Sequence, residues 1–212
     1  MTADARQRAD NWLENQSLVE AEFGNAVEAR AILGEVGNRS GLAAIVLAQV
    51  GDTAGAQSIS DEIAKRWPVG TLAQKIRLPL IRAAIAVQRG EGAEAIEALR
   101  PAIAYDLAPP WPIDYPVVGY PMILYLRGQA HLHNGDSAAA ATAFQRMLDH
   151  RGFAVTSPIY PLAYVGLARA RALAGDKATA RKAYEQFFSI WKDADPDIPI
   201  LRQAKAEYAK LN

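Results

Sequence analysis

Cysteine is missing from the 212-residue sequence, and its absence excludes two kinds of site. Without thiols the chain has no disulfide framework and no thiolate metal site, which is consistent with a reducing cytoplasm. An excess of positive charge is missing as well, because 23 lysine and arginine residues balance 23 aspartate and glutamate residues. Since phosphate neutralisation supplies most of the affinity for nucleic acids, we expect no nucleic-acid partner.

Long apolar runs are also lacking. No stretch reaches the roughly 18 apolar residues that a membrane-spanning helix needs. Residues 1–20 carry several charges and no apolar centre, so they do not resemble a secretory signal. With 50% hydrophobic and 22% charged residues, the chain has the composition of a folded protein. We therefore expect a folded, cytoplasmic protein with no membrane partner.

What the sequence does contain is one local pattern that occurs five times. A glycine is followed by a polar residue that can cap a helix, and an alanine lies four residues after that polar residue. Glycine can adopt the left-handed conformation that ends one helix, and alanine lets two helices cross closely. The pattern therefore predicts five helical pairs with a tight corner inside each. The corners and their alanines are Gly24-Asn25 with Ala29, Gly51-Asp52 with Ala56, Gly90-Glu91 with Ala95, Gly135-Asp136 with Ala140, and Gly175-Asp176 with Ala180.

Apolar periodicity around these corners predicts an all-α fold. The last pair shows an apolar stripe at helical spacing, formed by Ala180, Tyr184, Phe187 and Phe188. A pair cannot cover such a stripe alone, so the pairs must stack into a solenoid. A final helix is expected to cap the open end, with Asp197 capping its start and Glu207 facing water. The eleven expected helices lie near 4–22, 26–35, 39–50, 53–66, 71–89, 92–105, 120–134, 137–150, 161–174, 177–191 and 198–211.

The solenoid is interrupted at residues 106–121, which contain five prolines and three large aromatic residues. Proline removes a helical hydrogen bond, so this stretch is not expected to be helical. We interpret it as an irregular insertion in a single domain spanning residues 1–212. Its aromatic side chains either pack on the solenoid or contact a partner, because long insertions between repeats often lie on the binding face.

The helical pairs resemble the tetratricopeptide repeat, a helix–turn–helix unit of 34 residues. Trp67-Pro68 matches the proline that often ends that repeat, and Gly128 matches a small residue of its first helix. The resemblance implies a protein–protein interaction or scaffolding module, with no cofactor and no catalysis of its own. In such modules the first helices of the pairs form a concave face that binds a peptide. By that register, together with the insertion, the expected partner-binding residues are Trp111, Tyr115, Tyr120, Tyr125, Gln129, His133 and Arg169.

A narrower resemblance concerns residues 125–136, 144–152 and 191–212, and it extends over most of the chain, including residues 47–68 and 81–101. They are similar to the C-terminal repeat region of bacterial, often acidobacterial, serine/threonine protein kinases and winged-helix transcription regulators. This implies a sensor or regulatory region whose effector domain is absent from this chain. A Gly-rich phosphate loop and an Asp-Phe-Gly motif are missing, and His150-Arg151-Gly152 lacks the catalytic aspartate of a kinase. A stand-alone interaction module and the regulatory end of such a protein both stay open.

Other candidates for chemistry have simpler explanations. His131 and His133 would point to nearly opposite sides of one helix, so they cannot share a metal ion. Arg82 and Arg127 occupy a repeat position that is usually apolar, and we favour internal packing over a partner's carboxylate. Acidic runs suit solvated faces or a helix start, and they are Glu91–Glu94–Glu97 and Asp193–Asp195–Asp197.

A clamp for a C-terminal carboxylate and an enzymatic pocket are two further hypotheses. Tetratricopeptide domains that grip a C-terminal carboxylate use a clamp of lysine, arginine and asparagine, whereas the matching positions here are Leu42, Ile81, Leu126 and Gly166. The resemblance therefore argues against that ligand. An enzyme that uses the 106–121 insertion as a pocket wall is the remaining alternative, although no catalytic residue and no metal site is expected.

Overall fold

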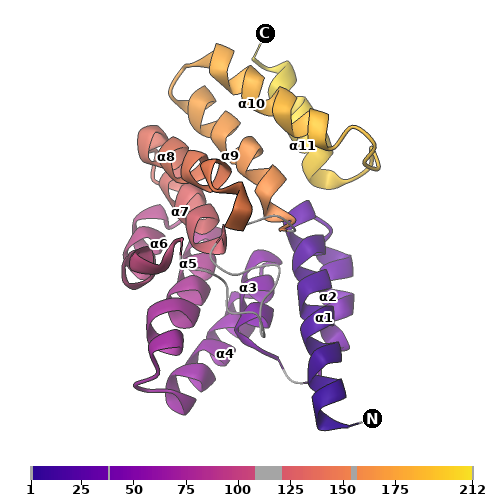
Figure 1. Ribbon diagram of the computed structural model, residues 1–212, viewed down its shortest axis with the longest axis vertical. Coiled ribbons are helices and arrows are strands. Elements are labelled where there is room, and N and C mark those ends of the chain that lie inside the picture. The colour runs from indigo at the N-terminus through magenta and orange to yellow at the C-terminus, as the bar shows by residue number, and fades with distance from the viewer. Residues whose placement is uncertain (1, 38, 108–120, 154–156, 212) are drawn as a thin grey trace.

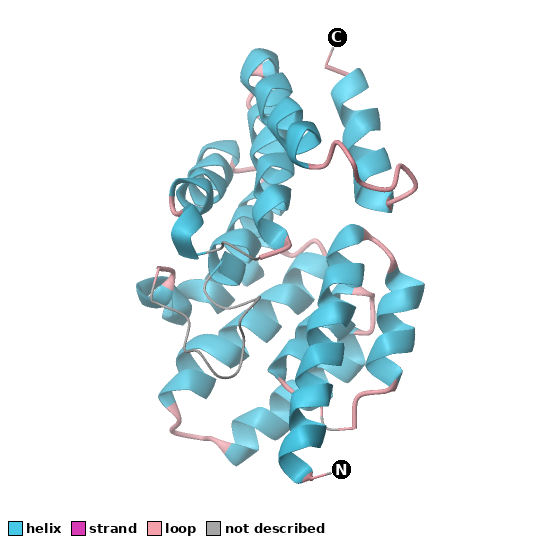
Figure 2. Ribbon diagram, turned by 45° about the vertical axis from the view of Figure 1, so that its right-hand side comes forward, coloured by secondary structure: helices cyan, strands magenta, loops and turns pink. Residues whose placement is uncertain are grey.

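The computed structural model describes residues 2–37, 39–107, 121–153 and 157–211. These residues form helices and turns and include no strand (Figure 2). The all-α solenoid with a last, capping helix is confirmed. The helices are α1 (Ala3–Phe23), α2 (Ala26–Gly34), α3 (Gly41–Gln49), α4 (Thr53–Arg66), η1 (Ala73–Arg77), α5 (Leu78–Gln88), α6 (Gly92–Leu99), η2 (Arg100–Tyr105), α7 (Pro121–His133), α8 (Ser137–Asp149), η3 (Arg151–Phe153), α9 (Ile159–Leu173), α10 (Lys177–Ile190) and α11 (Pro199–Ala209).

The five corner glycines have the conformation that the sequence pattern predicts. Their φ angles lie between +75° and +90°, and no other described residue has a positive φ. Each corner closes with two backbone hydrogen bonds, as when Gly175 N–H donates to Ala172 and Asp176 N–H donates to Arg171. The alanine that follows each corner is fully buried, at 0% exposure in all five pairs. Close helix crossing at these alanines is therefore confirmed.

The polar residue of the corner caps the second helix in three pairs of the five. The carboxylates of Asp52, Asp136 and Asp176 each accept a hydrogen bond from the backbone three residues later. Asn25 and Glu91 make no such bond, so the predicted capping is wrong there. The Asn25 side chain donates instead to a carboxylate oxygen of α1.

Two prolines modify helices that the sequence predicts as continuous. Pro79 lacks an N–H, and its ring would collide with the carbonyl four residues earlier in a regular helix. A π-helical turn, η1, precedes it and absorbs this mismatch. Pro101 follows α6 in the same way, and the chain continues as the 3-10 helix η2. The prediction of two uninterrupted α-helices is therefore wrong at these points.

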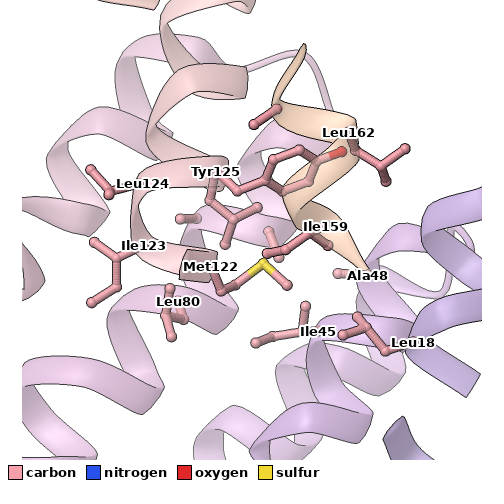
Figure 3. Packing of buried hydrophobic residues seen from close by; sticks show 14 of the residues in the cluster. Leu18, Ile45, Ala48, Leu80, Met122, Ile123, Leu124, Tyr125, Ile159 and Leu162 are labelled. Atoms are coloured by element: carbon pink, nitrogen blue, oxygen red, sulfur yellow. The ribbon is translucent and has the colours of Figure 1, made fainter. Parts of the chain in front are cut away.

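The helices stack in two layers. Each first helix packs against its own second helix and against the first helix of the next pair, so α1, α3, α5, α7 and α9 form an inner layer. Figure 1 shows this succession, from the indigo α1 through the central α3 and α5 to the orange α9. Buried residues of all five inner helices belong to one core cluster, including Leu18, Ile45, Leu80, Met122 and Ile159 (Figure 3).

The solenoid curls until its C-terminal end meets its N-terminal helix (Figure 1). Helix α11 packs on α10 and also touches α1. The rings of Phe23 and Trp191 meet edge to face, with their centroids 4.7 Å apart. A Cβ atom on Gly24 would lie only 2.9 Å from the Cβ of Pro199. The helices therefore form a closed ring, which the sequence pattern did not predict.

Helix α11 covers the apolar stripe of α10, as expected. Tyr208 packs against Tyr184 and Phe188, with ring centroids 6.2 and 5.6 Å away. Two details differ from the prediction. The residue before α11 is Ile198, which makes no side-chain cap, so Asp197 does not cap this helix. Glu207 turns inward and is held by α9 and α10, so its expected solvent-facing position is wrong.

The described part of the chain contains no helix that is both long and apolar enough to cross a membrane.

Candidate functional site

A hollow of about 600 Å³ lies inside the ring, and we call it the central pocket. Its walls come from α11 and from all five inner helices, so it exists because the ring closes. This volume is in the range of small-molecule and side-chain binding pockets. The lining residues are Ala21, Glu22, Gln49, Ala84, Val87, Gln88, Tyr125, Leu126, Gln129, Leu132, His133, Arg169, Leu173 and Ile200.

Most lining residues share a position relative to their corner glycine. The residue two places before the glycine lines the pocket in every pair, and these five are Glu22, Gln49, Gln88, His133 and Leu173. The residue six places before it lines the pocket in the last three pairs, at Ala84, Gln129 and Arg169. Since all first helices run in the same direction, equivalent positions face the same centre. Two repeat positions, one used five times and the other three times, thus supply eight of the fourteen lining residues.

Glu22 is the centre of a polar network in the pocket wall. Its carboxylate accepts hydrogen bonds from the Gln49 side-chain amide and from the Tyr125 hydroxyl. Gln129 in turn hydrogen-bonds to Tyr125. The network therefore links α1, α3 and α7 across the inner layer.

The electrostatic state of Glu22 is unusual. Burial raises the pKa of its carboxyl to about 7, because the hydrogen bonds from Gln49 and Tyr125 only partly replace lost water. Burial and the nearby Glu22 raise the pKa of Tyr125, so its hydroxyl keeps the proton that it donates. Protein surrounds Glu22 on most sides, and the exposed part of its side chain faces the pocket. Above this pKa the pocket thus holds a carboxylate that no cation among the described residues neutralises.

Arg169 is the cation of the pocket wall, and its charge is already balanced. Its Nε and Nη2 atoms lie 2.9 and 3.1 Å from the two carboxylate oxygens of Glu207. The Tyr184 hydroxyl donates to the same carboxylate at 2.6 Å. Burial opposes ionisation of Glu207, but the hydrogen bonds from Arg169 and Tyr184 outweigh it and lower the pKa. This bidentate pair also ties α9 to α11.

The structure brings together four of the seven residues predicted to bind a partner. Tyr125, Gln129, His133 and Arg169 all line the central pocket. Their role in binding stays a prediction. The other three, Trp111, Tyr115 and Tyr120, lie outside the described residues, as does most of the 106–121 insertion.

Sequence reasoning missed Glu22 and Gln49, although a signal for both was present. Each lies two residues before its corner glycine, which is the position of His133 in the fourth pair. Applying the register of the fourth pair to the first two would have placed both residues on the concave face. The hydrogen bond between Tyr125 and Glu22 could not be predicted in this way, because it joins repeats that are far apart in the sequence.

The remaining candidates lie away from the pocket. Asp106 opens the insertion and accepts hydrogen bonds from Nε and Nη2 of Arg146 at 3.0 and 3.1 Å. Arg127 lies 3.7 Å from the same carboxylate, so its predicted internal pairing is confirmed, whereas Arg82 is exposed. Nδ1 of His131 lies 3.6 Å from Asp136. Both acidic runs are exposed, so the solvated face predicted for Glu91, Glu94 and Glu97 is confirmed.

A metal site has no candidate cluster among the described residues. No group of three histidine, cysteine, aspartate or glutamate side chains there could hold a metal ion. The clamp positions identified by resemblance carry apolar or small residues that are buried, namely Leu42, Ile81, Leu126 and Gly166.

Stacked helical pairs with a concave inner layer define a helical repeat protein. A family model described as tetratricopeptide repeat matches residues 82–155 and 125–196. Together these matches cover more than half of the 212 residues, so the chain belongs to the tetratricopeptide repeat family. No curated protein and no solved structure shows a significant match to it. Repeats of this family generally mediate protein–protein interactions.

Proposed function

We propose that the central pocket and its rim bind a protein or peptide partner, and that the chain acts as one interaction domain without catalysis. The observation that carries the proposal is the convergence of equivalent positions from five repeats on one pocket of about 600 Å³. Its walls combine apolar surface with a few convergent polar groups, which is the composition of a recognition site. The tetratricopeptide repeat family is typically non-catalytic, and a cytoplasmic location stays a prediction.

Site-specific cross-linking tests this proposal. A photo-reactive phenylalanine analogue replaces Gln129 in the pocket wall, and in a control replaces Gln57, which is exposed on the outer helix α4. We expect a partner protein to cross-link in cells through position 129 and not through position 57. A partner captured through position 57 alone would show that the outer surface, and not the pocket, is the binding face.

The 106–121 insertion supports an extension of the proposal to Trp111, Tyr115 and Tyr120. Large aromatic residues supply much of the binding energy at protein interfaces, and five prolines limit the entropy lost on binding. Replacing Trp111 and Tyr115 together by alanine distinguishes the two roles. If they contact the partner, stability holds while cross-linking through position 129 weakens. If they anchor the insertion to the solenoid, the free energy of unfolding falls by several kcal/mol.

A second proposal concerns the kind of partner. The similarity of residues 125–136, 144–152 and 191–212 to the repeat region of bacterial kinases and winged-helix regulators supports an effector domain as the partner. The cross-linking experiment tests it directly, because the captured protein or segment can be identified by mass spectrometry. Capture of a protein without a kinase or winged-helix domain would contradict this second proposal and leave the first intact.

A further inference from the structure

We infer that the central pocket takes up a basic side chain of the partner, a lysine ammonium or an arginine guanidinium carried on an aliphatic stem. The inference rests on the proposed function and names the chemical group that the pocket recognises. It depends on four features of the described part of the pocket. These are a carboxylate without a counter-charge, a hydrogen-bond acceptor without a donor, an arginine that already pairs with a carboxylate, and an apolar wall.

Glu22 is the carboxylate that no cation among the described residues neutralises. Its two hydrogen-bond donors, Gln49 and Tyr125, are neutral groups. A buried carboxylate without a counter-charge lowers stability, and such groups persist mainly where function needs them. A cation entering the pocket would supply the missing counter-charge. A charged partner therefore gains an ion pair with a carboxylate that is only partly exposed to water.

The free acceptor belongs to Gln49. Its Nε2 atom donates to Glu22, which leaves Oε1 buried and without a hydrogen-bond partner among the described residues. When Glu22 is ionised, the opposite orientation of this amide would place its oxygen against the carboxylate, so this orientation belongs to the charged form. Unsatisfied buried acceptors cost free energy, and a donor satisfies them. An ammonium or guanidinium group brings only donors and suits both Glu22 and Gln49.

An anionic ligand does not fit the same pocket. Arg169 already uses two guanidinium nitrogens on the Glu207 carboxylate, and burial of the pair makes its disruption costly. An anion would meet the negative charge of Glu22, and the described lining residues include no further arginine or lysine to offset it. The pocket therefore selects positive charge, in contrast to a clamp for carboxylates.

The wall of the pocket suits the aliphatic part of a basic side chain. Apolar side chains from five helices line it, and these are Ala21, Ala84, Val87, Leu126, Leu132, Leu173 and Ile200. Lysine and arginine bury their methylene groups along such surfaces while the charged end reaches a polar partner. The stem would thus lie against α5, α7, α9 and α11 while the charge reaches Glu22 on α1.

Proton binding by Glu22 gives this recognition a pH dependence. The groups around Glu22 come from five other helices. They are Gln49 from α3, uncharged residues from α5, Tyr125, Gln129 and His133 from α7, Arg169 from α9, and Glu207 from α11, which pairs with Arg169. Because the pKa of Glu22 is about 7, its ionised fraction rises about tenfold between pH 6 and pH 8. Affinity for a cation should rise with it. His133 also lines the pocket, so a His133→Gln variant serves as control.

The test uses short blocked peptides of sequence Ala-Ala-Xaa-Ala-Ala, where Xaa is lysine, norleucine or glutamate, with n-butylammonium as a free amine. Binding to the full chain is followed by NMR through the side-chain amides of Gln49 and Gln129. We expect the lysine peptide to bind at least tenfold more tightly than the norleucine peptide at pH 8. This advantage should shrink about tenfold at pH 6, persist in His133→Gln and vanish in Glu22→Gln.

Three outcomes would overturn the inference. Equal affinity for the lysine and norleucine peptides would show that the pocket does not recognise the positive charge. Peptide binding in the pocket, and hence the proposed function, would then still stand. Binding of n-butylammonium as tight as that of the lysine peptide would assign the pocket to a free amine. If millimolar lysine peptide left the NMR chemical shifts of the Gln49 and Gln129 side-chain amides unchanged, the pocket would not bind a basic side chain. The cross-linking experiment would then decide on the proposed function separately.

Discussion

At the scale of single residues, Phe144 shows how closely the inner and outer helices pack. Its ring is fully buried between Gly128 on α7 and Gly166 on α9. A Cβ atom added at Gly128 would lie 2.5 Å from the ring, and one added at Gly166 would collide with it in the same way. Glycine at these two positions is therefore required by space and not by backbone conformation, since neither has a positive φ.

This packing predicts that Gly166→Ala lowers stability. The new methyl group forces Phe144 or α9 to shift, which should reduce the free energy of unfolding by about 1–3 kcal/mol. The matched control is Gly34→Ala at the end of α2, where a Cβ atom would meet nothing within 4 Å. Urea denaturation followed by circular dichroism measures both. Equal midpoints for Gly166→Ala and the parent would show that Phe144 is not held between the two glycines.

Glu22 predicts an unusual dependence of stability on pH. The pKa of its carboxyl rises from 4.5 to about 7 on folding, so the folded state holds this proton more tightly than the unfolded state does. The carboxylate therefore lowers stability as pH rises from about 4.5 to 7, and the loss is complete above pH 7. The free energy of unfolding of Glu22→Gln should exceed that of the parent by about 1–3 kcal/mol at pH 8 and should nearly equal it at pH 4.

The control for this prediction is Glu20→Gln, two residues away on the same helix. It should show no gain in stability that grows with pH. A Glu22→Gln variant that is less stable than the parent at pH 8 would show that the carboxylate already has a counter-charge in the folded protein.

At the scale of helices, the second half of each pair was the easier part to predict. The corner glycine and the alanine four residues beyond the polar residue are local signals, and both hold in all five pairs. The ends of α5 and α6 were harder, because Pro79 and Pro101 convert neighbouring turns into π and 3-10 geometry without ending the helical path. The inward turn of Glu207 was not predictable, since its partners Arg169 and Tyr184 lie on two other helices.

The bidentate pair between Arg169 and Glu207 makes a prediction for α11. Glu207→Gln keeps the size of the side chain but leaves a half-buried guanidinium without its carboxylate, so stability at pH 7 should fall by about 1–3 kcal/mol. The folded pKa of Glu207 is lowered, so its contribution is present above pH 4.5 and is lost as pH falls through that lower value. The difference between parent and variant should therefore shrink below pH 4.5.

Thermal or urea denaturation at pH 7 and pH 4 provides the comparison, with Arg202→Gln on the exposed face of α11 as control. An unchanged midpoint for Glu207→Gln at pH 7 would mean that the pair does not hold α11 on α9.

At the scale of the whole molecule, closure of the ring is what turns repeat positions into a pocket. Five repeats that point equivalent residues inward would form an open groove if the superhelix were straighter. Helix α11 and the contact between Phe23 and Trp191 bring α1 into the wall that holds Arg169 and Ile200. The sequence could not reveal this closure, because it depends on small rotations summed over repeats of unequal length. Binding at the central pocket therefore depends on a feature of the ring as a whole.

An engineered disulfide between Gly24→Cys and Pro199→Cys tests this closure most directly. The chain has no cysteine of its own, and the two Cβ positions lie 2.9 Å apart, close enough to the usual separation of about 3.8 Å for a modest backbone shift to join them. As a control, Gly34→Cys replaces Gly24→Cys, because its Cβ position meets nothing within 4 Å. We predict that mild oxidation removes both free thiols of the Gly24→Cys, Pro199→Cys protein as an intramolecular bond, while the control keeps its thiols. Persistence of free thiols in the test pair, at the rate seen in the control, would mean that the solenoid is open and that the central pocket does not form.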